Sequence, residues 1–203
     1  MDAFFTGVVA GYGIAIPVGA IAILIMEVGI RRGFRPAFFA GAGAATADLL
    51  YASLAVLGGA ALAGAAGSIG APLRTVSGLV LAVIAVVGLR RALVGTEPPP
   101  AEQQRGADLA RIYGRFVGLT VINPTTVVYF AAVIIGLGVA EGMTAGDGFL
   151  FVVGAFLASL SWQTVVAAAG AAAGRRLRPV WKTGVSVVGN LLILGFGLVI
   201  LFR

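Results

Sequence analysis

One carboxylate stands in the middle of a long apolar stretch of the chain. Asp48 lies within the run from Ala37 to Leu62, which is long enough to cross a lipid bilayer. A charged group at the centre of such a helix costs roughly 2.5 to 3.5 kcal/mol on insertion scales. Because of this cost, an ionisable residue at that depth indicates a function, such as holding a cationic group or taking up a proton. The alternative is that Asp48 only bonds a neighbouring helix.

The residues beside Asp48 predict the direction in which it points. At helical spacing, Asp48 shares one face with four small residues. These are Gly41, Ala45, Ala52 and Ala55. Small residues are typical of the faces on which membrane helices pack closely. We therefore expect Asp48 to point into the protein and not into lipid.

Two prolines near the middle of apolar segments indicate broken or kinked helices. A proline inside a helix removes one backbone hydrogen bond and clashes with the preceding turn. Pro17 is followed closely by Gly19, and Pro124 follows Asn123, a favourable helix cap that would place Thr125 and Thr126 in a first turn. Helix N-termini inside the membrane suit the carboxylate of a small zwitterion, because they carry partial positive charge and free N–H groups. The alternative is a pair of ordinary kinks that serve packing.

Further polar and aromatic side chains lie in the apolar segments. They could line or gate a pathway, or they could bond and pack between helices. Glu27 is expected to pair with Arg31, four residues later, and is not counted among them. The complete set of candidate substrate-binding or coupling residues is Asp48, Asn123, Pro124, Thr125, Pro17, Gly19, Ser159, Gln163, Tyr51 and Trp162.

The composition excludes several kinds of chemistry. The chain has no Cys and no His, so disulfides, thiol chemistry and His-based metal or proton relays are excluded. We find no phosphate-binding glycine loop, metal-ligand cluster or nucleophile triad, and we expect no enzyme activity, cofactor or metal site. The net charge of +6 comes from basic residues in loops, where membrane topology explains it without a nucleic-acid partner.

Long apolar segments predict an all-α integral membrane protein. Hydrophobic residues make up 60% of the chain and charged residues 11%, against about 25% charged in soluble domains. Each segment has about 20 residues or more, which is the length needed to cross a bilayer. The six segments are Phe4–Met26, Phe38–Leu62, Val76–Val94, Phe116–Leu137, Gly148–Ala173 and Thr183–Phe202.

The basic residues predict the orientation of the six segments. Of the 14 Lys and Arg residues, 12 follow the first, third or fifth segment, and only Arg74 and Arg203 fall elsewhere. By the positive-inside rule, these three loops are cytoplasmic and both termini lie outside. The sequence thus predicts a multi-pass protein of the cytoplasmic (inner) membrane.

A polar, proline-rich stretch divides the chain into two halves. We predict a first three-helix repeat at 1–94, a flexible cytoplasmic linker at 95–115 and a second three-helix repeat at 116–203. Because three is odd, the halves would enter the membrane in opposite directions, which is the plan of inverted-repeat transporters. An ungapped match between the second and fifth segments pairs Asp48 with Ser159 and Tyr51 with Trp162.

Four short motifs carry a resemblance to a known family. The chain resembles the LysE/RhtB family of amino-acid exporters over nearly its whole length. Where that family usually has Pro-Gly-Pro, this chain has Pro17-Val18-Gly19, and Asn123-Pro124-Thr125 stands where Asn-Pro-Lys is usual. The motifs are Ile16-Pro-Val-Gly-Ala20, Glu27-Val-Gly-Ile-Arg-Arg-Gly33, Gly41-Ala-Gly-Ala-Ala-Thr-Ala-Asp48 and Gly118-Leu-Thr-Val-Ile-Asn-Pro-Thr125.

The resemblance implies a secondary transporter that exports an amino acid or a similar small solute. It also implies coupling to an ion gradient, and Asp48 makes a proton the expected coupling ion. Two alternatives stay open: a cation exporter of the same superfamily, and a non-transport membrane assembly protein. Lipid is an expected partner, and the small size of the chain suggests a homodimer.

Overall fold

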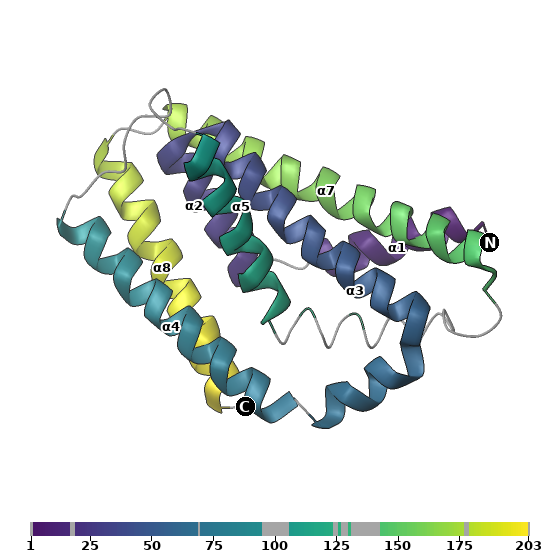
Figure 1. Ribbon diagram of the computed structural model, residues 1–203. Helices are drawn as coiled ribbons and strands as arrows, with labels where there is room; N and C mark the ends of the chain where they lie inside the picture. Colours follow the sequence, from purple (N-terminus) through teal and green to yellow (C-terminus); the bar gives the residue numbers. More distant parts are fainter. Residues whose placement is uncertain are drawn as a thin grey trace.

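A computed structural model describes residues 2–16, 19–68, 70–94, 106–123, 126, 130, 143–176 and 179–202. This described part of the chain is helical and contains no strand. The helices, drawn in Figure 1, are α1 (Ala3–Ala15), α2 (Ala20–Arg32), α3 (Phe34–Ser68), α4 (Gly70–Val94), α5 (Gly106–Val121), α7 (Ala145–Arg176) and α8 (Pro179–Phe202). The all-α prediction is therefore confirmed for the described residues.

The first apolar segment forms two helices. α1 ends at Ala15, α2 begins after Gly19, and the two helix axes are bent by 78° relative to each other. Pro17, at which we predicted the break, lies outside the described residues. α2 ends at Arg32 and is followed by Gly33, whose φ of 84° is open to glycine and strained for other residues, so the chain turns there and enters α3.

α5 begins ten residues before the apolar segment predicted at Phe116, within the stretch predicted as a linker. Its first turns are polar on one side only. Its buried or partly buried side chains recur at helical spacing, so α5 has one apolar face. A search for long apolar runs overlooks such a face. That face carries Leu109, Ile112, Phe116 and Leu119.

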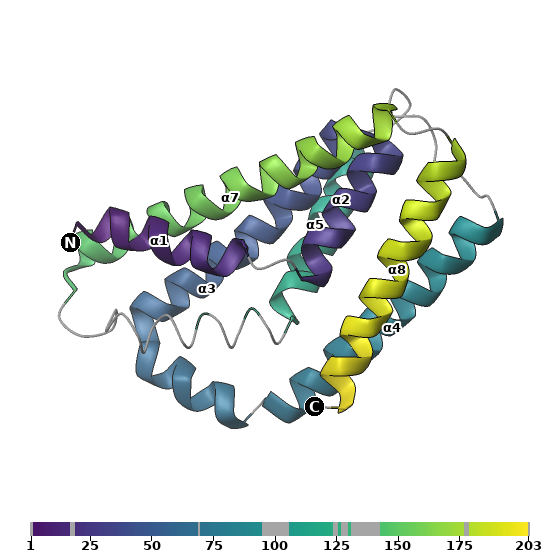
Figure 2. The ribbon, with the colours of Figure 1, turned by 180° about the vertical axis from the view of Figure 1, so that it is seen from behind.

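α7 is the central element of the packing. This 32-residue helix packs against α1, α2 and α3, and α3 in turn packs against α5. α4 and α8 lie side by side as a separate pair, and α8 also contacts α2 (Figures 1 and 2). The largest buried cluster joins the two groups through Ile25 of α2, Leu81 of α4 and Ile193 of α8.

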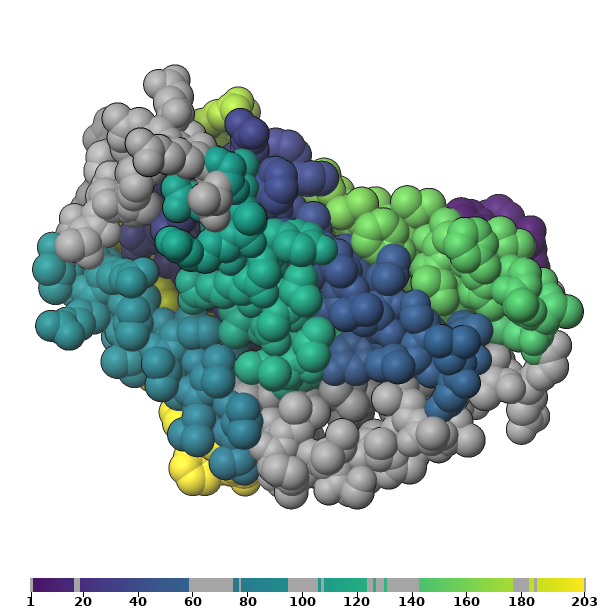
Figure 3. All heavy atoms as spheres, viewed as in Figure 1, coloured from purple at the N-terminus to yellow at the C-terminus, as the bar shows by residue number. Residues whose placement is uncertain are grey.

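The described residues contain three candidates for membrane-spanning segments, and much of the fourth of the six predicted segments lies outside them. Within the described residues, Phe34–Gly58 and Ala145–Arg176 are long and apolar enough to cross a membrane, and the bent α1–α2 pair is a third candidate. Large apolar side chains such as Phe5 and Phe149 are exposed on the outside of the bundle, as expected for surfaces that meet lipid. On the face in Figure 3, α3, α4, α5 and α7 all reach the surface.

Candidate functional site

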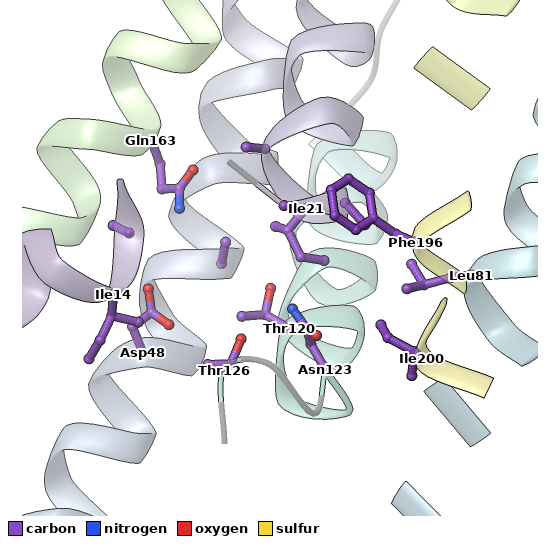
Figure 4. A pocket seen from close by; sticks show the side chains of 15 residues that line it. Ile14, Ile21, Asp48, Leu81, Thr120, Asn123, Thr126, Gln163, Phe196 and Ile200 are labelled. Carbon is purple, nitrogen blue, oxygen red and sulfur yellow. The ribbon is translucent and has the colours of Figure 1, made fainter. Parts of the chain in front are cut away.

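A cavity of about 170 Å³ lies where α1 and α2 separate, and we call it the central cavity. Its walls come from α1, α2, α3, α4, α5, α7 and α8 (Figure 4). The apolar part of the lining includes Ile14, Ile21, Leu81, Phe196 and Ile200. The polar part consists of Asp48, Thr120, Asn123, Thr126 and Gln163.

Asp48 points inward, as the small residues on its helix face predicted. Its side chain is 6% exposed, and Ala45, Ala52 and Ala55 on the same face are almost fully buried. The hydroxyl of Ser159 on α7 donates a hydrogen bond of 2.6 Å to Asp48 Oδ2. Asp48 is the only ionisable residue among the described residues that line the central cavity. The site is therefore polar, with one acidic group and no basic one in its described lining.

Two further polar atoms of the lining have no partner within the described part of the chain. They are the hydroxyl of Thr120 and the side-chain Oε1 of Gln163, both buried. A buried polar group without a hydrogen bond costs free energy, of the order of 1 to 3 kcal/mol in protein mutational data. Both residues line the central cavity, so a polar ligand or ordered water held there would remove the cost.

The N-terminus of α2 also faces the central cavity. Gly19 is its N-cap and makes no side-chain capping bond. Gly19 and the first three helical residues, Ala20, Ile21 and Ala22, line the cavity. The first N–H groups of a helix lack partners within it and carry partial positive charge. This helix end can bind an anionic group of a ligand.

The end of α5 forms another part of the cavity wall. α5 ends at Val121, and the carbonyl of Asn123 accepts a bond of 3.1 Å from the N–H of Thr126. Tyr51 donates a hydrogen bond of 2.6 Å from its hydroxyl to the carbonyl of Val121 and stacks on Phe130. Tyr51 therefore satisfies a carbonyl at a helix end, which matters in a setting where water is scarce.

The candidate residues from the sequence fall into three groups. The first group lines the central cavity and consists of Asp48, Gly19, Asn123 and Gln163. Ser159 belongs with this group because it donates a hydrogen bond to Asp48. Tyr51 and Trp162 do not line it; Trp162 packs partly buried against the main core. Pro17, Pro124 and Thr125 lie outside the described residues.

Sequence reasoning missed Thr120 as a lining residue. It lies inside Gly118-Leu-Thr-Val-Ile-Asn-Pro-Thr125, a motif of which only Asn123, Pro124 and Thr125 were among the candidates. Its position could have revealed it. Thr120 comes four residues after the buried Phe116, so it lies on the inward face of α5. Thr126, two residues after Pro124, lines the cavity as well.

The described residues contain no group of three or more His, Cys, Asp or Glu side chains placed to hold a metal ion. Besides Asp48, the polar side chains of the described cavity lining are the hydroxyls of two threonines and the amides of Asn123 and Gln163. Such a set suits organic polar groups, and one carboxylate is few for a divalent cation.

Comparison with known proteins gives two matches. A family model described as LysE type translocator matches residues 13–203, which is nearly the whole chain. The chemotactic transduction protein ChpE of Pseudomonas aeruginosa is 29% identical over 161 residues, which cover 78% of this chain and 77% of that protein. No solved structure gives a significant match.

Proposed function

The chain belongs to the LysE type translocator family, and from this premise we propose that it exports an amino acid or a similarly small solute across the cytoplasmic membrane. The family and the apolar helices support a multi-pass membrane translocator, and we propose no enzyme activity. The direction of transport is inferred from the family, and the substrate and the ion coupling are inferred from the central cavity.

The observation that carries the proposal is the pairing of two opposite charges in one cavity. Asp48 supplies a negative group, and the uncapped N-terminus of α2 supplies N–H groups and a partial positive charge. A free amino acid carries an ammonium and a carboxylate on one carbon atom. We assign the ammonium to Asp48 and the carboxylate to the first turn of α2, with Thr120 and Gln163 as further hydrogen-bonding partners.

The size of the central cavity favours a small substrate. Its volume of about 170 Å³ is close to that of an engineered cavity of about 150 Å³ that binds benzene in another protein. Benzene has six non-hydrogen atoms, as alanine does. We therefore expect small amino acids to bind this conformation better than long basic ones.

Asp48 also supports coupling to an ion gradient. A buried carboxylate is costly to keep charged in an apolar region, and Ser159 is the one donor to Asp48 among the described residues. A cationic substrate or a proton would each lower that cost, and the two would compete for the same oxygen atoms. Exchange between them couples solute export to proton entry.

We extend the proposal to the architecture of the membrane domain. Six spanning segments would form two inverted three-helix repeats, with the interruptions at Pro17 and Pro124 in the first and fourth. The gap between α1 and α2 supports a break at the first of these positions. One group of helices would rock against the other around the central cavity, and a homodimer would provide the surrounding protein surface.

A second candidate function follows from the relative ChpE, whose name places it in chemotactic transduction. This chain could serve a signalling or assembly complex without moving a solute. Such a role does not require a polar cavity with unpaired groups, so we rank it below transport.

The test is a transport assay on the purified wild-type protein in proteoliposomes. A panel of labelled amino acids, from glycine to lysine, is followed with and without a proton gradient, beside labelled monovalent and divalent metal cations. Gradient-dependent movement of small amino acids supports the proposal. Movement of a metal cation alone would replace it with cation export, and movement of nothing would favour the signalling or assembly role.

A further inference from the structure

A second, larger hollow lies away from the central cavity. Its volume is about 450 Å³, and α2, α4, α5 and α8 form its walls. It lies at the end of the molecule where α2 and α4 end and where α5 and α8 begin (Figure 1). We call it the basic pocket, because four arginines line it. They are Arg31, Arg32, Arg91 and Arg115.

The charges around the basic pocket do not balance. Glu27 is the only acidic residue among its described lining residues, and its carboxylate already pairs with Arg31 at 3.2 Å. Asn190 donates a further hydrogen bond of 3.0 Å to the same carboxylate oxygen. The described lining of the basic pocket therefore contains four arginines and one acidic residue, and that acidic residue is already paired with Arg31.

Arg31 is held firmly in place. Its Nε donates to Ser186 Oγ at 2.7 Å and contacts Glu27, which fixes the guanidinium between α2 and α8. Its Nη2 is buried and has no hydrogen-bond acceptor within the described part of the chain. A donor group that is buried, charged and unpaired is costly, and an anion beside it would remove that cost.

Electrostatics at Arg115 agrees with this picture. Desolvation lowers the pKa of its guanidinium, and the neighbouring charges of Arg91 and Arg32 lower it further, while Glu27 acts in the opposite direction. The repulsion among these cations would be relieved by a bound anion.

The rest of the lining is apolar. Val28, Val87, Ile112 and Phe116 belong to this apolar part of the lining. Val87 of α4 is exposed, although α4 packs closely on α8. A ligand with an oxyanion and an attached apolar part matches both halves of this surface.

We propose that the basic pocket binds a phosphate-class oxyanion, carried by the headgroup of an anionic phospholipid or by soluble phosphate. The arginines provide forked N–H groups that match phosphate oxygens. By the positive-inside rule this end of the protein faces the cytoplasm, where anionic headgroups attract basic segments.

The test uses the full-length protein in neutral detergent micelles that contain phosphatidylcholine. Its Tm is measured as phosphatidylglycerol replaces part of the phosphatidylcholine, and separately as inorganic phosphate is added at constant ionic strength. The pocket variant is Arg91→Gln with Arg115→Gln. The matched control is Arg90→Gln with Arg111→Gln, which removes the same charge from the same helices at exposed positions outside the lining.

We expect one of the two anions to raise the Tm of wild type and of the control variant. We also expect the pocket variant to lose more than half of that rise. An effect of phosphatidylglycerol alone assigns the oxyanion to a lipid headgroup, and an equal effect of phosphate assigns it to a soluble ion. Equal losses in both variants, or no rise with either anion, would overturn the proposal. If the pocket variant does not fold, native mass spectrometry of wild type and control must show retained phosphatidylglycerol or phosphate, and its absence overturns the proposal as well.

Discussion

At the scale of single residues, the central cavity contains two kinds of polar side chain. Asp48 accepts a hydrogen bond from Ser159, whereas the hydroxyl of Thr120 and Oε1 of Gln163 have no partner in the described structure. The first kind stabilises the fold, and the second kind lowers stability unless a ligand is bound. Substitutions can therefore separate stability from function.

The first prediction concerns Thr120→Val, which keeps the shape of the side chain and removes its unpaired hydroxyl. We expect unchanged or slightly higher thermal stability, because a buried unpaired group is lost. Apparent substrate affinity in the transport assay should fall about fivefold, corresponding to roughly 1 kcal/mol for one hydrogen bond. A large fall in Tm would show that the hydroxyl serves the fold.

The second prediction concerns Ser159→Ala. The hydrogen bond to Asp48 is lost, so the free energy of unfolding should fall by about 1 to 3 kcal/mol, seen as a lower Tm in detergent. Ser53→Ala is the matched control, because the Ser53 hydroxyl bonds only the Leu49 carbonyl of its own helix among the described contacts. Equal effects of the two substitutions would argue against a special role for the Ser159–Asp48 pair.

At the scale of elements, α7 provides the surface against which α1 and α2 are placed. Glycines allow the close approach: a Cβ at Gly7 or Gly11 would meet the backbone of Phe151 or Ala155. The same holds on α7, where Gly170 and Gly174 face the backbone of α2. Small residues four apart are typical of such tight contacts between membrane helices.

The third prediction compares two glycines of α1. Gly11→Ala should destabilise the protein by about 1 to 3 kcal/mol, because the added methyl group meets backbone atoms of α7 that cannot easily move. Gly13→Ala should be neutral or stabilise α1 by up to about 1 kcal/mol, since a Cβ there has open space. Thermal unfolding of the two variants checks this, and similar Tm values would contradict the packing described here.

The helices that consist of long apolar runs were predictable from the sequence. The bodies of α3, α4, α7 and α8 contain the second, third, fifth and sixth predicted segments. α5 was placed too late, because its first turns are apolar on one face only and contact the core through Leu109 and Ile112. The helical spacing of the apolar residues indicates where α5 begins, whereas the length of the apolar run does not.

The candidate site was predictable in part. Asp48, Gln163 and Asn123 were found because polar residues are rare in apolar segments, and all three line the central cavity. Tyr51 was grouped with them on the same grounds, but it bonds the carbonyl of Val121 away from the cavity lining. The sequence predicts that such a residue lies in an apolar segment. Its hydrogen-bond partner depends on how helices that are distant in the sequence pack together.

At the scale of the whole molecule, three helices end at the same end of the molecule where α5 and α8 begin (Figures 1 and 2). Basic residues stand in the last turns of these three helices: Arg31 and Arg32 in α2, Arg91 in α4, and Arg175 and Arg176 in α7. The positive-inside rule predicts that this end faces the cytoplasm, which would place the basic pocket on the inside.

The fourth prediction uses the two ends of α7. The natural chain has no Cys, so a single introduced cysteine is labelled without background. In intact spheroplasts, a membrane-impermeant maleimide should label Ala145→Cys at once and Arg176→Cys only after permeabilisation. Both positions are exposed at opposite ends of the helix. The reverse pattern would invert the orientation, and labelling of both would contradict a membrane-spanning α7.

The account as a whole depends most on Asp48. The most direct measurement is gradient-driven export of a small labelled amino acid from proteoliposomes that contain wild type or Asp48→Asn, with Asp108→Asn as a control outside the cavity lining. We predict that Asp48→Asn folds with a similar Tm and reduces transport to the level of protein-free liposomes, while Asp108→Asn transports like wild type. Undiminished gradient-dependent export by Asp48→Asn would contradict the central claim.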